Sequence, residues 1–129
     1  MKELLATLYH QRMLVTAAIL FVIGFGGLLF NWNLIKKIVG LNIMDTAVYL
    51  ALTSAGYVDG RVAPIISDPS VPAKMEQFIN PVPTGLVLTG IVVSVSFTAF
   101  SLALTVRLYR KYGTLYLDDI LFRAKRSVD

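Results

Sequence analysis

Three long apolar runs dominate the pattern of hydrophobic and polar positions along the chain. They cover about residues 13–30, 36–56 and 82–107, and their charges lie at the ends, apart from Asp45. A run of roughly 18 or more apolar residues is long enough to cross the hydrocarbon core of a bilayer as a helix. We therefore predict an all-α integral membrane protein with three transmembrane helices. These helices and their connections use nearly the whole chain, so we expect one membrane domain.

The segments outside the predicted spans differ in character. Residues 57–80 are polar, and all five prolines of the chain lie between Pro64 and Pro83. Because proline disrupts helices, we predict a loop there with at most one short helical turn. Residues 1–12 carry leucines on one face and are expected to extend the first helix outward into the membrane interface. Residues 112–129 mix apolar and charged positions, which indicates a tail on the membrane surface or on a partner protein.

The charge distribution predicts how the chain lies in the membrane. Of 129 residues, 56% are hydrophobic and 16% are charged, whereas about a quarter of residues are charged in soluble domains. The net charge of +4 comes from basic residues that flank the spans, so we expect contact with the bilayer and no nucleic-acid binding. Eight of the 12 Lys and Arg residues lie on the side of the C-terminus. The positive-inside rule then predicts a multi-pass cell-membrane protein with a cytoplasmic C-terminus and an external N-terminus and 57–80 loop.

The composition argues against a catalytic centre in this chain. It contains no cysteine and one histidine, so it offers neither thiolate ligands nor a histidine cluster for a metal. No Ser/His/Asp or glycine-rich phosphate-binding motif is present. We therefore predict no enzyme activity of the chain by itself and expect no metal site and no cofactor. Any redox chemistry would belong to another polypeptide.

A polar stripe runs along the second predicted span. At about 100° per residue, one face of this helix collects Asn42, Asp45, Thr46 and Tyr49. A carboxylate at membrane depth costs about 2.5–3.5 kcal/mol on insertion scales, and such residues mark ion or proton paths by default. Our hypothesis is that these four residues contribute to an ion path. The alternative is a structural hydrogen-bond or ion-pair network that holds helices or subunits together.

Small and hydroxyl-bearing residues in the other spans predict close helix packing. Such residues allow helix backbones to approach each other in membranes. The predicted packing positions are Gly24 and Gly27 in the first span and Ser94, Thr98 and Ser101 in the third.

Three segments together resemble a known family of membrane subunits. They are NLIKKIVGLNIMDTAVYLAL at 33–52, INPVPTGLVLTGIVVSVSFTAFSLAL at 79–104 and YGTLYLDDI at 112–120. Over about residues 26–120 the chain resembles the C subunit of Mrp-type multisubunit Na⁺/H⁺ antiporters. That protein is similar to the K, or 4L, subunit of respiratory NADH–quinone oxidoreductase. The same subunit type occurs in membrane-bound hydrogenases.

The resemblance also exposes departures from the family pattern. Asn80 stands where the family usually has aspartate, and Asn42 stands where the respiratory protein has a second-span glutamate. The family's third-span glutamate aligns near Phe97, so no acid is present there. Asp45 lies one turn after Asn42 on the same face. We therefore take Asp45 as the candidate replacement for the missing carboxylate.

The resemblance implies a subunit that works inside a large hetero-oligomeric complex. Its expected partners are other membrane subunits, including large antiporter-like ones. Three alternatives remain open from the sequence. The chain belongs to the membrane arm of a redox-driven ion pump, it is a purely structural three-helix assembly subunit, or it forms a small homo-oligomeric transporter. The last alternative fits poorly with an odd number of spans and one long loop.

Overall fold

The computed structural model describes residues 1–65, 69, 70, 72 and 74–127, and this part of the chain is helical and without strands. Three of its helices are long and apolar enough to cross a membrane, which confirms the predicted three-span, all-α class. In chain order the elements are α1 (Lys2–His10), α2 (Arg12–Phe30), α3 (Leu34–Gly56), the short 3₁₀ turn η1 (Met75–Gln77), α4 (Val82–Tyr112) and α5 (Leu117–Arg126).

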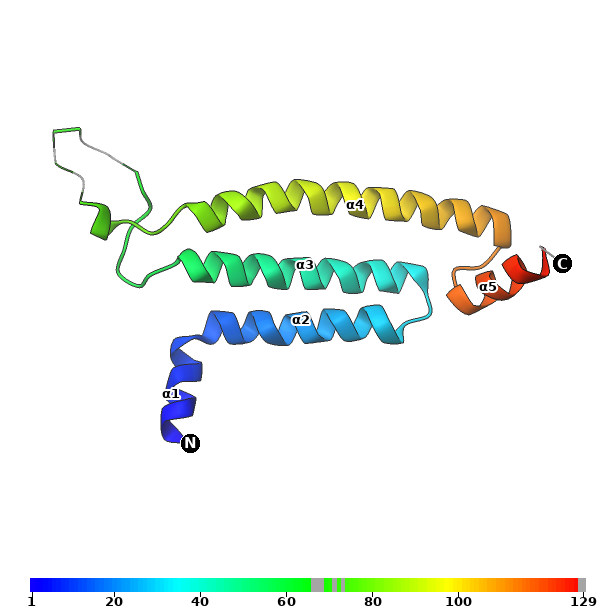
Figure 1. The fold of residues 1–129 in the computed structure, drawn as a ribbon, viewed down its shortest axis with the longest axis horizontal. Helices are drawn as coiled ribbons and strands as arrows, with labels where there is room; N and C mark the ends of the chain where they lie inside the picture. Colours follow the sequence, from blue (N-terminus) through cyan, green and yellow to red (C-terminus); the bar gives the residue numbers. More distant parts are fainter. Residues whose placement is uncertain (66–68, 71, 73, 128–129) are drawn as a thin grey trace.

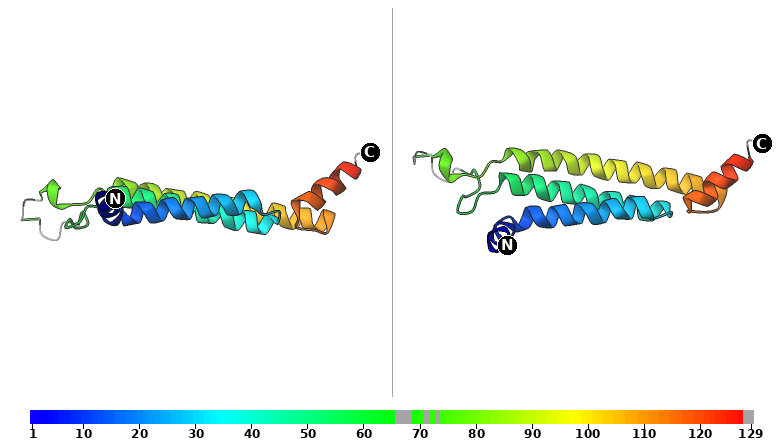
Figure 2. Two further views of the ribbon diagram at one scale, coloured as in Figure 1. Left: turned by 90° about the horizontal axis from the view of Figure 1, so that it is seen from below. Right: turned by 60° about the horizontal axis from the view of Figure 1, so that its bottom comes forward.

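The three long helices form a flat row with α3 in the middle (Figures 1 and 2). The sequence of α3 explains this arrangement, because its two contact surfaces lie on opposite sides of the helix. Gly40 meets the backbone of α2, and Asp45 binds a side chain of α4. At about 100° per residue these two positions point in widely different directions. The central helix α3 therefore lies between α2 and α4, and the three helices do not pack around a common core.

Very little of this row is buried by the chain itself. Among the residues whose burial the structure describes, those that are buried, apart from glycines, are Ala17, Ala47, Thr105 and Ile120. The accessible surface is 10163 Å², whereas a compact soluble monomer of this mass exposes about 6,800 Å². The excess consists largely of apolar side chains on both faces of the row, which lipid or other protein must cover.

The N-terminal segment corrects one prediction. Residues 1–12 do not continue α2 outward as a single helix. At Gln11 the backbone takes φ −101° and ψ 30°, and α1 runs across the direction of α2 (Figure 1). The exposed Leu4 and Leu5 on this separate helix suit a position in the interfacial layer, where a short amphipathic helix lies along the membrane plane.

The observed helix ends differ slightly from the predicted spans. The second helix starts at Leu34 instead of residue 36, because the Asn33 side chain accepts hydrogen bonds from the Ile35 and Lys36 amides and caps it. The third helix passes the predicted membrane span at residue 107 and continues to Tyr112, as expected from the glycine that follows. It ends at Gly113, whose φ of 71° lies in the left-handed region that favours glycine.

The connections hold further short structure. The 57–80 loop contains η1, and its residues 66–68, 71 and 73 lie outside the described residues. In the tail, α5 is attached to the α2–α3 turn by two backbone hydrogen bonds. The Leu34 amide donates to the Leu115 carbonyl at 3.0 Å, and the Leu117 amide donates to the Trp32 carbonyl at 2.9 Å. The tail is therefore fixed beside that turn from its first residues onward.

Candidate ion-path site

Three polar contacts join α3 to α4 in the middle of the row. The Ser94 hydroxyl donates to Asp45 Oδ2 at 2.6 Å, and the Thr98 hydroxyl donates to Asn42 Oδ1 at 2.7 Å. The Tyr49 hydroxyl donates to a backbone oxygen, the Gly90 carbonyl, at 2.7 Å. As the residue number rises along α3, the number of the partner residue on α4 falls, as expected for two antiparallel helices. The three contacts therefore form a continuous polar line between two helices.

The sequence spacing explains why these groups meet. On α4, positions 90, 94 and 98 recur every four residues and so share one face. Gly90 has a special reason to be glycine, because a Cβ there would lie 2.7 Å from Cε1 of the Tyr49 ring. The missing side chain lets the Tyr49 ring lie against α4 and reach its backbone. Gly90 lies one turn before the predicted packing positions Ser94 and Thr98 and was not itself predicted from the sequence.

Asp45 lies halfway along its helix. It lies eleven positions after Leu34 and eleven positions before Gly56, which corresponds to about 17 Å of helix on either side at a rise of about 1.5 Å per residue. The Ser94 hydroxyl is its hydrogen-bond donor at this depth. The O···O distance of 2.6 Å falls in the range of about 2.5–2.7 Å that is typical of a hydroxyl bound to a carboxylate. A polar donor from the same chain thus compensates in part for the loss of water.

An open groove of about 630 Å³ runs beside this line of contacts. We call it the α3–α4 groove. All four residues of the predicted polar stripe line its α3 wall, and Thr46, which is exposed, donates its hydroxyl to the Asn42 carbonyl. Its α4 wall is mostly apolar apart from Ser94 and Thr98, and consists also of Ile91, Val95, Ala99 and Leu102. The groove places the Asp45 carboxylate at the open side of the row, and its described lining comes from α3 and α4 alone.

The predicted glycines of the first span lie on the other side of α3. A Cβ on Gly24 would lie 2.8 Å from the Gly40 carbonyl oxygen, and one on Gly27 would lie 3.5 Å from Gly40 Cα. These contacts are between backbones, so α2 and α3 touch without intervening side chains. Their counterpart, Gly40, was not predicted as a packing residue, although its position within an apolar helix was a usable signal.

The remaining predicted positions have different surroundings. Ser101 is half-buried, and its carbonyl accepts the hydroxyl of the buried Thr105 at 2.8 Å. Phe97, which the resemblance aligns near the family's third-span glutamate, is 52% exposed. The described α3–α4 contacts therefore contain one carboxylate, at Asp45.

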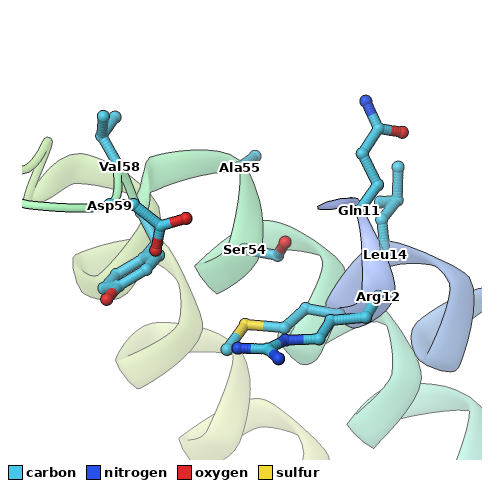
Figure 3. A pocket seen from close by; sticks show the side chains of 9 residues that line it. Gln11, Arg12, Leu14, Ser54, Ala55, Val58 and Asp59 are labelled. Carbon is cyan, nitrogen blue, oxygen red and sulfur yellow. The ribbon is translucent and has the colours of Figure 1, made fainter. Parts of the chain in front are cut away.

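A second cavity, of about 610 Å³, lies at the end of the row where α1 meets α2. Figure 3 shows its walls, with Arg12 at the start of α2 on one side and Asp59 beyond the end of α3 on the other. Its other lining residues are Gln11, Met13, Leu14, Ser54, Ala55, Tyr57 and Val58. Its described lining contains none of the four residues of the polar stripe, so it is separate from the α3–α4 groove.

Comparisons with known proteins agree with this architecture. Residues 12–123 match the family model of NADH-ubiquinone/plastoquinone oxidoreductase chain 4L. The chain is 34% identical over 109 residues to the C subunit of the Na⁺/H⁺ antiporter of Alkalihalophilus pseudofirmus, covering 84% of this chain and 91% of that protein.

Similar chains occur in solved structures, among them the following two. One is the membrane-bound sulfane sulfur reductase, an archaeal respiratory membrane complex. Its chain is 42% identical with a TM-score of 0.73, covering 82% of this chain and 94% of that one. The other is the Mrp complex of a Dietzia species, at 28% identity and a TM-score of 0.62, covering 74% of this chain and 70% of that one. The chain therefore belongs to the NADH-ubiquinone/plastoquinone oxidoreductase chain 4L family and is a relative of the C subunit of Na⁺/H⁺ antiporters.

Proposed function

We propose that this chain is a small membrane subunit of an Mrp-type multisubunit cation/proton antiporter module. In this role Asp45, Asn42, Thr46 and Tyr49 contribute to an intramembrane polar path. The observation that supports the proposal best is the position of Asp45 at mid-helix, hydrogen-bonded to Ser94 and lining the open α3–α4 groove. A carboxylate there can take up and release a proton or attract a cation, and neighbouring hydroxyls can pass a proton along hydrogen bonds.

The open groove also explains why the chain would act inside a complex. A path for protons or cations needs polar groups or water along its length, and lipid chains provide neither. The groove has an α4 wall that is apolar apart from Ser94 and Thr98, and no third wall from the described part of this chain. We infer that a neighbouring membrane protein of the complex closes it, and that the helix contacts at Gly24, Gly27, Ser94, Thr98 and Ser101 hold this subunit in shape. Catalytic chemistry and cofactors would then belong to other chains.

Charge supports an orientation for this subunit. Of the 12 Lys and Arg residues, eight lie at the end of the row that carries α5 and the α2–α3 turn. The positive-inside rule assigns that end to the cytoplasm, with the N-terminus and the 57–80 loop outside. Labelling of single cysteines introduced at Ser127 and Ser70 by a membrane-impermeant thiol reagent tests this assignment, since the chain has no native cysteine. In intact cells we expect labelling at position 70, and labelling at 127 instead would reverse the orientation.

A second candidate rests on the more similar of the two solved structures. The chain of the sulfane sulfur reductase complex matches at 42% identity, compared with 28% for the Mrp complex. The same subunit in the membrane arm of a redox-driven ion pump is therefore the alternative. Purification of the tagged chain in mild detergent with mass spectrometry of its partners distinguishes the two. Antiporter-like subunits alone favour an antiporter, and additional metal-cluster proteins favour a redox-driven pump.

The ion-path role is tested by Asp45→Asn in the assembled complex. The amide keeps the size of the side chain and a hydrogen-bonding oxygen but removes the ionisable group. We expect normal assembly and ion transport that falls at least about tenfold, because positioned proton-transfer groups contribute about 10²–10⁴ in rate. The matched control is Asp118→Asn on the exposed face of α5, which should transport normally.

Two outcomes would contradict this role. Full transport by Asp45→Asn in the intact complex would mean that Asp45 lies on no essential path. Loss of assembly in this variant, with normal assembly of Asp118→Asn, would support the purely structural alternative.

A further inference from the structure

The end of the row that carries α5 concentrates positive charge beside exposed aromatic side chains. Residues 107–127 contain six basic and two acidic residues, and the six basic side chains are all exposed. They are Arg107, Arg110, Lys111, Arg123, Lys125 and Arg126, and we call them the basic corner. Basic residues in the last turn of a helix interact favourably with the helix dipole, but this effect concerns one helix at a time. The positive-inside rule assigns the six cations to one side of the membrane but names no ligand for them.

The length of α4 assigns the basic corner to the headgroup layer. Its 31 residues extend for about 46 Å at about 1.5 Å per residue, whereas the hydrocarbon core is about 30 Å thick. Arg107 is the first charged residue of α4, so the helix leaves the hydrocarbon region near this position. Trp32, Tyr109 and Tyr116 are 59%, 51% and 53% exposed near this end of the row. Exposed Trp and Tyr side chains are typical of the membrane–water interface.

The fold also prevents α5 from moving away from this layer. Two backbone hydrogen bonds attach residues 115 and 117 to the α2–α3 turn, and the Arg123 guanidinium donates to the Tyr112 carbonyl at the end of α4. Ile120 is buried in this junction, while Leu121 beside it is 58% exposed. Because α5 is held at the membrane boundary, its basic side chains and the exposed Leu121 are positioned to contact lipid headgroups and acyl chains. A flexible tail would not hold these side chains in place.

We propose that the basic corner binds the phosphate groups of anionic phospholipids in the adjacent leaflet. Arginine and lysine donate charge-assisted hydrogen bonds to phosphate, and groups of four to eight basic residues next to a transmembrane helix attract anionic lipid. The ligand is a lipid surface with negative headgroups, and the exposed Leu121 contacts the acyl region below them. This proposal is independent of ion transport through the α3–α4 groove.

Trp32 provides the probe, since it is the one tryptophan of the chain and lies in the turn to which α5 is attached. The full chain is placed in phosphatidylcholine nanodiscs that contain a minor fraction of either brominated phosphatidylglycerol or brominated phosphatidylcholine. Bromine quenches tryptophan fluorescence at short range. We expect stronger quenching by the brominated phosphatidylglycerol, because each basic residue near the surface raises local anionic lipid by about fivefold.

Three variants make the test specific. Replacing Arg107, Arg110 and Arg126 with glutamine should reduce the preference for the anionic lipid at least about tenfold. Replacing the same residues with lysine keeps the charge and should retain the preference. The matched control replaces Lys2, Arg61 and Lys74 with glutamine at the opposite end of the row, which removes the same charge and should leave the preference unchanged.

Equal quenching of the wild-type chain by both brominated lipids would overturn the proposal. So would an unchanged preference in the glutamine variant.

If that variant fails to fold, a salt titration of the wild-type chain replaces it. Raising the salt to roughly 1 M shortens the screening length to about 3 Å and should abolish the preference. A preference that persists at this salt would also overturn the proposal. If the wild-type chain shows no lipid preference and the glutamine variant loses a protein partner, the ligand is an acidic protein and the lipid proposal is rejected.

Discussion

Replacing Gly40 with alanine should separate the two helices that lie closest together in this protein. A Cβ at this position would lie 2.8 Å from the Leu28 amide nitrogen and 2.9 Å from the Gly24 carbonyl oxygen. Both are backbone atoms of α2, so no flexible side chain can move aside. Relief of the clash requires α2 to retreat as a whole from α3.

The magnitude follows from this geometry. Overpacking of a well-packed contact costs about 1–3 kcal/mol. Alanine is also favoured over glycine within a helix by about 1 kcal/mol, an effect that any Gly→Ala change in these helices shares. Gly85 supplies the matched control, because a Cβ there meets nothing within 4 Å. The difference between Gly40→Ala and Gly85→Ala should therefore isolate the packing cost, at about 2 kcal/mol.

The assay is reversible unfolding of the full chain in mixed micelles, in which a denaturing detergent replaces a mild one while helix content and tryptophan fluorescence are followed. Gly40→Ala should unfold at a lower fraction of denaturing detergent than wild type. Gly85→Ala should unfold at the same fraction as wild type or a slightly higher one. Equal free energies of unfolding for the two variants would refute the argument that backbone contact between α2 and α3 stabilises the row.

Three further changes test other parts of the structure in the same assay. Thr98→Val keeps the shape of the side chain but leaves Asn42 Oδ1 without its donor. It should lower the free energy of unfolding by about 1–3 kcal/mol, whereas the control Thr89→Val at an exposed site should be nearly neutral. Asn33→Ala removes the cap of α3 and should cost about 1 kcal/mol, and no loss would mean that water caps the helix equally well. Gly113→Ala forces a left-handed φ of 71° on a residue with a Cβ and should lower stability by about 1 kcal/mol. A gain in stability there would show that the turn after α4 has no such requirement.

The sequence predicted the spans well because hydrophobicity acts locally. Each apolar run is independent of the others, so its length is enough to identify a membrane helix. The glycine that ends α4 was also recognised from the sequence, whereas the start of α3 was predicted two residues late because it depends on the side-chain cap of Asn33. The separate α1 was missed because no proline or glycine marks the bend at Gln11.

The sequence by itself determined three membrane helices, a polar stripe on the second and a hydroxyl stripe on the third. These follow from residue type and helical period alone. Only the tertiary structure decided which stripes meet. It paired Asp45 with Ser94 and Tyr49 with the Gly90 carbonyl, and it set Gly40 against α2. Helix pairing depends on shape complementarity and hydrogen bonds between distant segments, and a helical period in one segment carries no information about its partner.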